Sequence, residues 1–180
     1  MINLKLQHCH PGLISRSIIL TLSLLFLTGC GFHLRAMHPL PHQLSTLYVK
    51  TPHKYSYFTK QLKKSLRHVN VNVANTKHAA PYTLEIQRIA FTHNTPTLGT
   101  STQARVYRLH YDMLFQLIKR NGKTVLSPRT ISTHSQLTLN RNQLLNTNDE
   151  LTLIKHEMER RLIDRLFYQL SSNNVKQSLR

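Results

Sequence analysis

Residues 104–139 read ARVYRLHYDMLFQLIKRNGKTVLSPRTISTHSQLTL, and the first half of this stretch decides the fold that we expect. Every second residue from Tyr107 to Leu117 is large and apolar, which is the spacing of a β-strand with one buried face. The alternating residues Arg108, His110 and Asp112 should therefore face away from the core. The pattern predicts a long strand over residues 104–119.

A hairpin turn should follow this strand. Asn121-Gly122 is the dipeptide most typical of a tight turn between antiparallel strands, so a second strand should run back over residues 124–139. Pro128 has no backbone N–H to donate, and it predicts a bulge or a sheet edge early in the returning strand.

The rest of the chain predicts further strands and two helices. Strands are expected over residues 46–51, 70–74 and 82–92, and an amphipathic helix is expected over residues 55–69. A final helix should begin near the capping-box pair Thr147 and Glu150 and end before Ser171. Its apolar residues recur at helical spacing and are Leu151, Ile154, Met158, Leu162, Leu166 and Leu170.

These elements indicate an α+β fold. We expect a two-layer sandwich in which one mostly antiparallel, four-stranded sheet is covered by two helices. The domain should occupy residues 47–172. A tether over residues 30–46 should precede it, and a flexible basic tail over residues 173–180 should follow.

The N-terminus has the form of a bacterial lipoprotein signal. Lys5 and Arg16 precede an apolar run, residues 18–27, that is too short to span a bilayer, which takes about 20 apolar residues. Leu27-Thr28-Gly29-Cys30 then resembles a lipobox, so we expect residues 1–29 to be removed and Cys30 to carry lipid. An ordinary signal peptide with a chance cysteine is the alternative.

The residues around the expected cleavage point indicate where the mature chain goes. In lipoproteins generally an acidic residue after the cysteine favours the inner membrane, and Gly31 therefore points to the outer membrane, with the domain on its periplasmic side. The other cysteine, Cys9, would leave with the signal segment. The mature domain would then have no thiol and no disulfide.

The chain is strongly basic. It has 24 Lys and Arg against 7 Asp and Glu, and removing Lys5 and Arg16 still leaves 22 against 7. In a cytosolic protein this balance would favour nucleic-acid binding, but behind a lipobox the available polyanions are phospholipid headgroups and lipopolysaccharide. A generally basic proteome is the alternative explanation.

Neither an enzyme nor a metal site is indicated. There is no catalytic cysteine, no Gly-x-Ser-x-Gly motif and no glycine-rich phosphate loop, and five of the 7 acids lie on the final helix, where capping and surface pairing explain them. Among the histidines of the mature chain only His38 and His42 have a chelating spacing, and the prolines between them exclude a helix. We therefore expect no cofactor.

Basic residues mark the three-strand region and its turns as a candidate phosphate-binding surface. They are Arg88, Arg105, Arg108, Lys119, Arg120, Lys123 and Arg129. Arginine can hold a phosphate through two parallel hydrogen bonds. A merely solvated sheet face would show the same spacing, so the residues alone leave both readings open.

The opening of the mature chain, Cys30-Gly31-Phe32-His33-Leu34-Arg35, resembles the LptE/RlpB family of lipopolysaccharide-assembly lipoproteins. The similarity continues through Leu40-Pro41, Tyr107-Arg108-Leu109, Gly122 and Asn148-Asp149-Glu150-Leu151 to Leu170, and so covers nearly all of the mature chain. Three places depart from the family pattern: Ala36, Thr133-His134-Ser135-Gln136, and Thr147, for which Arg141 is the nearest basic substitute. The candidate lipopolysaccharide contacts are Arg105, Arg108, Lys119, Arg120, Lys123, Arg129 and Arg141.

The resemblance implies a non-enzymatic role at the outer membrane. Members of the family sit as a plug inside the β-barrel LptD, assist the assembly of that barrel and bind lipopolysaccharide on its way to the cell surface. LptD and lipopolysaccharide are therefore the implied partners, and nucleic acid is not. Two alternatives stay open: a free-standing outer-membrane lipoprotein that binds anionic envelope polymers, and a periplasmic metal binder that uses its histidines.

Overall fold

The computed structural model describes residues 39–94, 97–98, 104–140 and 147–179, all within one compact unit, residues 37–180. The expected signal segment and Cys30 lie outside the described residues.

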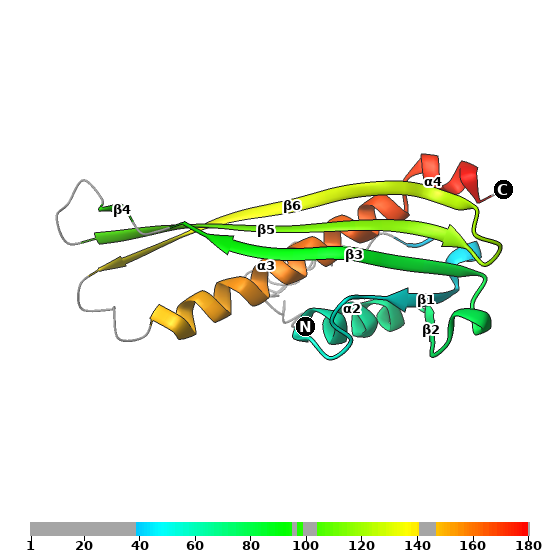
Figure 1. The fold of residues 1–180 in the computed structure, drawn as a ribbon, viewed down its shortest axis with the longest axis horizontal. Helices are drawn as coiled ribbons and strands as arrows, with labels where there is room; N and C mark the ends of the chain where they lie inside the picture. The colour runs from blue at the N-terminus through cyan, green and yellow to red at the C-terminus, as the bar shows by residue number, and fades with distance from the viewer. Residues whose placement is uncertain (1–38, 95–96, 99–103, 141–146, 180) are drawn as a thin grey trace, which may run out of the picture. The chain divides into compact units, whose positions relative to one another are not determined.

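The described residues form strands and helices that Figure 1 shows in chain order. The strands are β1 (Thr46–Lys50), β2 (Asn72–Ala74), β3 (Tyr82–His93), β4 (Thr97–Leu98), β5 (Ala104–Lys119) and β6 (Thr124–Asn140). The helices are α2 (Tyr57–His68), α3 (Thr147–Leu170) and α4 (Asn173–Ser178), with short 3-10 turns η1 (His42–Leu44) and η2 (Lys77–Ala79). The α+β class and the bounds of the two long helices agree closely with expectation.

The six strands form one mixed sheet. Strand β1 lies between β2 and β3 and is parallel to both, whereas β3, β4 and β6 all run antiparallel to β5. The expectation of a mostly antiparallel, four-stranded sheet was therefore wrong. Helix α2 connects β1 to β2 as a crossover, and a crossover brings the next strand back in the same direction.

The β5–β6 hairpin confirms the prediction from the sequence. The Gly122 N–H donates to the Lys119 carbonyl oxygen at 2.9 Å, and Gly122 adopts φ 86°, a conformation that glycine reaches without strain. The pairing with β5 shifts twice between Ile118 and Phe115, so β6 contains two bulges. Pro128 lies at one of them, on a strand that pairs only with β5 among the described residues.

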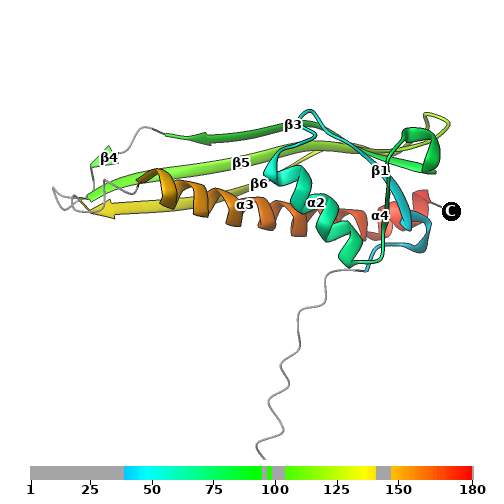
Figure 2. The ribbon, with the colours of Figure 1, turned by 90° about the horizontal axis from the view of Figure 1, so that it is seen from below.

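Helices α2 and α3 lie against the same face of the sheet, as Figure 2 shows. This face is the predicted one, because Leu109, Tyr111, Met113, Phe115 and Leu117 of β5 are all buried. The helices contribute Phe58, Leu62 and Leu66 from α2 and Met158, Leu162, Ile163, Leu166, Phe167 and Leu170 from α3 to the same core.

Helix α2 begins and ends at residues suited to helix ends. The Ser56 side chain accepts a hydrogen bond from the Thr59 N–H at 3.2 Å, which satisfies one of the free donors of the first turn. After the C-cap Val69, Asn70 has φ 61°, and asparagine is one of the few residues that tolerate this left-handed conformation.

The ordered domain extends beyond both expected boundaries. Leu44, in the expected tether, is fully buried in the core ahead of β1. Residues 173–178, expected to be part of a flexible tail, form α4 instead. Val175 and Leu179 lie four residues apart on this segment, and both are buried in the same core.

Candidate functional site

The candidate site lies on the face of the sheet opposite the helices, which we call the outer face. On β5 it comprises the residues that alternate with the core residues: Arg108, His110, Asp112, Leu114, Gln116 and Ile118. On one side of β5, Arg88 of β3 lies beside Leu114, and Ala90 lies beside Asp112. On the other side, Ser132 of β6 lies beside Asp112, and His134 lies beside His110. The prediction that Arg108, His110 and Asp112 face away from the core is confirmed by this arrangement.

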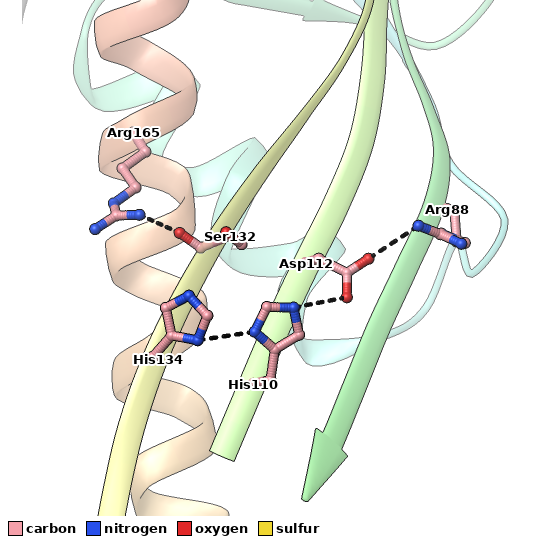
Figure 3. A network of polar contacts seen from close by, with 6 residues as sticks. All are labelled: Arg88, His110, Asp112, Ser132, His134 and Arg165. Carbon is pink, nitrogen blue, oxygen red and sulfur yellow. Dashed lines mark hydrogen bonds and ion pairs between the residues drawn. The ribbon is translucent and has the colours of Figure 1, made fainter. Parts of the chain in front are cut away.

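Four outer-face side chains from three strands form a polar chain, which we call the Asp112 network (Figure 3). Arg88 Nη2 lies 3.3 Å from Asp112 Oδ2, and His110 Nε2 lies 3.5 Å from Asp112 Oδ1. His110 and His134 then face each other with their Nδ1 atoms 2.9 Å apart. One carboxylate therefore holds an arginine on one side and a histidine on the other.

The contact between the two rings couples the tautomers of the histidines, because one Nδ1 atom must donate and the other must accept. If His110 Nε2–H donates to Asp112, the Nδ1 atom of neutral His110 carries a lone pair and accepts. His134 Nδ1–H must then be the donor in the contact between the rings. In this tautomer the carboxylate orients His110, and His110 in turn orients His134.

A shallow depression adjoins the histidine pair. It is open to solvent, encloses about 420 Å³ and is lined by Arg108, Leu109, His110, His134, Ser135 and Gln136. The Asn94 side-chain oxygen accepts from the Arg108 backbone N–H at 2.6 Å, which fixes the end of β3 to β5 beside this depression. The guanidinium of Arg108 makes no hydrogen bond or ion pair with the described residues and is exposed.

A second polar cluster is centred on Glu85. Its carboxylate accepts hydrogen bonds from Lys50 Nζ at 2.5 Å and from Gln116 Nε2 at 2.7 Å. The hydrogen bond from Lys50, followed by the one from Gln116, lowers the pKa of the Glu85 carboxyl. The same contact raises the pKa of Lys50.

The predicted basic residues do not converge on one point. Arg108 lies beside the depression, whereas Lys119, Arg120 and Lys123 lie at the hairpin, at least eleven residues away along β5, or about 36 Å in an extended strand. Arg120 Nε donates to the Ala80 carbonyl oxygen at 3.1 Å, so this arginine ties the hairpin to the segment before β3.

The remaining candidates fall elsewhere. Arg129 lies opposite Phe115, at a bulge of β6, and its Nη1 donates to Gln169 Oε1 of α3 at 3.3 Å, away from the outer face. Arg105 is in β5, but its side chain lies outside the described residues, as does Arg141 altogether.

One acidic residue of the final helix is buried, contrary to the expectation that capping and surface pairing explain all of them. Glu159 is 3% exposed, and its Oε1 accepts a hydrogen bond from the Tyr111 hydroxyl at 2.9 Å. Burial is the main cause that raises the pKa of the Glu159 carboxyl. It is also the main cause that raises the pKa of the Tyr111 hydroxyl. Ile163 and Phe167 follow Glu159 at intervals of four, so a wider apolar stripe could have signalled this burial.

Two further features bear on the class of site. No helix among the described residues is long and apolar enough to cross a membrane. The described part of the chain also contains no cluster of three or more His, Cys, Asp or Glu side chains that could hold a metal ion. Two histidines that are far apart in the sequence, His110 and His134, are nevertheless in contact.

Comparisons with known proteins point in one direction. The sequence model of a family named LptE and described as lipopolysaccharide-assembly matches residues 44–170, well over half of the chain. A curated relative, the LPS-assembly lipoprotein LptE of Pectobacterium atrosepticum, is 23% identical over 166 residues, which cover 91% of this chain and 89% of that protein.

Solved structures share the fold. Lipoprotein B from Nitrosomonas europaea superposes with a TM-score of 0.64 and 18% identity, covering 82% of this chain and 96% of that one. Rare lipoprotein B from Shewanella oneidensis gives a TM-score of 0.61 and 19% identity, with 73% of this chain and 98% of that chain covered.

Proposed function

The chain belongs to the LptE family of lipopolysaccharide-assembly lipoproteins, and from this membership we propose that it works with the outer-membrane β-barrel LptD to place lipopolysaccharide at the cell surface. The observation that carries the proposal is the family match over residues 44–170, because these residues include the whole sheet and its two long helices. In this role the chain plugs the barrel, assists its assembly and binds lipopolysaccharide, and it performs no catalysis.

The proposed anchor is a lipid on Cys30 after removal of residues 1–29. Among the described residues, the first that is fully buried in the core is Leu44, fourteen positions after Cys30. A segment of that length reaches at most about 50 Å when fully extended. The lipid would therefore keep the domain within that distance of the membrane surface on the periplasmic side.

The outer face near Arg108 is the part of the sheet that we propose meets lipopolysaccharide. Both acids that the structure describes on this face are paired, Glu85 with Lys50 and Asp112 with Arg88. Among the described residues, the positive charge of Arg108 is therefore not compensated. A guanidinium that has no partner among the described residues and lies beside an open depression is suited to the phosphates of a glycolipid. Arg105, Lys119, Arg120, Lys123, Arg129 and Arg141 remain proposed contacts at separate places along the chain.

The first experiment asks what the full-length chain brings with it from the membrane. Outer membranes are solubilised in mild detergent, and the chain is captured by a C-terminal tag. A large β-barrel at near-equal stoichiometry supports the plug role. Abundant chain without any barrel, in membranes that contain LptD, contradicts it and favours a free-standing lipoprotein that binds envelope polyanions.

A second experiment tests the lipopolysaccharide surface. Arg108→Ala should weaken lipopolysaccharide binding about tenfold, because a hydrogen bond to a charged group contributes roughly 1.5–3 kcal/mol. Arg67→Ala, on the exposed side of α2, is the matched control for loss of one positive charge. Equal weakening in both variants would mean that binding follows net charge, and it would contradict the assignment of Arg108.

A further inference from the structure

The histidine pair of the Asp112 network has a geometry that the lipopolysaccharide proposal does not use. His110 and His134 are direct cross-strand partners, and their Nδ1 atoms approach to 2.9 Å with the rings tilted by 37° (Figure 3). The His110 side chain is 42% exposed, so solvent reaches the contact. Two imidazole nitrogens that approach each other at an open surface can share a proton or a metal ion.

The distance between the nitrogens favours one class of ion. Imidazole nitrogens bind transition metals at about 2.05 Å, so nitrogens that are 2.9 Å apart would subtend about 90° at a shared ion. This is the angle between neighbouring ligands in the square-planar or tetragonal geometry of copper(II) and nickel(II), and of these two ions copper(II) binds a given nitrogen site more tightly. Tetrahedral zinc would require a separation of about 3.3 Å, and hence a larger change in the distance between the nitrogens than copper(II) requires.

The neighbours of the pair provide the support that metal-binding histidines usually have. A histidine ligand commonly donates its other ring N–H to a carboxylate, which fixes the tautomer and the ring orientation. In His110 the Nε2 atom faces the Asp112 carboxylate at 3.5 Å while Nδ1 points at His134, so a small approach of the carboxylate would complete this arrangement. Arg88 holds the other oxygen of the same carboxylate at 3.3 Å.

We propose that His110 and His134 bind one copper(II) ion through their Nδ1 atoms, with Asp112 as a positioning residue. The ion would sit beside the line between the nitrogens, and the rings would turn toward it about χ2, a broad torsion in histidine. His134 would carry its proton on Nε2 in this state. The remaining coordination positions would face the depression beside Arg108 and take water or another oxygen ligand.

The test measures copper(II) binding to the full-length chain purified in detergent. Copper chloride is titrated in the presence of a weak competing chelator, and the bound ion is examined by electron paramagnetic resonance. Wild-type chain should bind one more ion than His110→Asn or His134→Asn, and its spectrum should show coupling to imidazole nitrogen that both variants lose. Copper should also raise the melting temperature of the wild type but not of these variants.

Two further variants keep the result interpretable. His68→Asn removes an exposed histidine from the end of α2 and should leave the extra ion in place, which controls for the other histidines of the chain. Asp112→Asn should bind this ion 10- to 100-fold more weakly while both ligands remain. Circular dichroism establishes that each variant is folded.

The outcomes separate the possibilities. Equal copper stoichiometry in the wild type, His110→Asn and His134→Asn would overturn the site and leave the pair as a hydrogen bond between strands. Wild-type affinity in Asp112→Asn would overturn the positioning role of that carboxylate. Neither result depends on lipopolysaccharide or LptD, so the copper site and the proposed function succeed or fail independently.

Discussion

Replacing Tyr111 by phenylalanine should destabilise the domain through one buried hydrogen bond. The Tyr111 hydroxyl is the donor to Glu159 Oε1, and the other carboxylate oxygen of Glu159 has no partner among the described residues. Both side chains are almost completely buried, at 3% exposure each. The variant would therefore leave the whole carboxyl group without a hydrogen bond in the core.

The expected magnitude follows from the cost of an unsatisfied buried polar group, which is about 2 kcal/mol. Tyr111→Phe should lose about this amount, and Glu159→Leu should lose a similar amount of about 2 kcal/mol because it strands the tyrosine hydroxyl. The double variant strands neither group and should lie within about 1 kcal/mol of wild type. The two single losses sum to about 4 kcal/mol, so the coupling energy between the two sites should be at least about 3 kcal/mol.

The assay is equilibrium urea unfolding of residues 37–180, the compact unit that contains both side chains. Tyr107→Phe is the matched control, because Tyr107 is on the same face of β5 but is only partly buried. It should change the free energy of unfolding by less than about 0.5 kcal/mol.

The pH dependence of the same variants gives an independent measure. Burial raises the folded-state pKa of Glu159 above the ordinary carboxyl value of 4.5, so the folded state binds more protons than the unfolded state in this range. The contribution of Glu159 to stability is thus fully present below pH 4.5 and falls as the pH rises through the folded pKa. Glu159→Leu should lack this decline. Additive losses in the double variant, or an unchanged pH profile in Glu159→Leu, would refute the reasoning.

Two further predictions concern the sheet and α2. Glu85→Gln should cost less than about 1 kcal/mol at neutral pH. The pKa of Glu85 is lowered in the folded state, so the extra stability of the wild type over Glu85→Gln should be present above pH 4.5. This extra stability should vanish as the pH falls through the folded pKa, and urea unfolding over a pH series would measure it. Ser56→Ala should cost about 1 kcal/mol, measured by thermal unfolding, because the Thr59 N–H loses its acceptor; an unchanged melting temperature would contradict the capping role.

The alternation of apolar and polar residues, together with the residues typical of turns, was sufficient to predict the long β5–β6 hairpin. Strand β5 covers the expected residues 104–119, because its side chains alternate strictly between the core and the outer face. The hairpin formed where Asn121-Gly122 indicated, since a residue with positive φ is needed there. Local patterns of this kind depend on neighbours in the chain and can be read without the rest of the fold.

The arrangement of the strands and their register required the structure. The parallel pairing of β1 depends on contacts with residues 26 to 35 positions away, such as Thr46 with Asn72 and Lys50 with Glu85. Next to the turn, Ile118 pairs with Thr124. If this register continued without bulges, His110 would lie opposite Ser132. The two bulges of β6 shift the partner by two residues to His134, and the Asp112 network arises from that shift.

The outer edge of β6 raises the question of how the chain avoids unwanted association. This strand runs from Thr124 to Asn140 and pairs on only one side within the described residues, and a long unpaired edge is a template for aggregation through added strands. Pro128 leaves this strand with one backbone donor fewer. Arg165 of α3 donates to the Ser132 carbonyl oxygen, as Figure 3 shows. Two features therefore oppose the addition of another strand at this edge. One is Pro128 within β6, and the other is the hydrogen bond from Arg165 of α3.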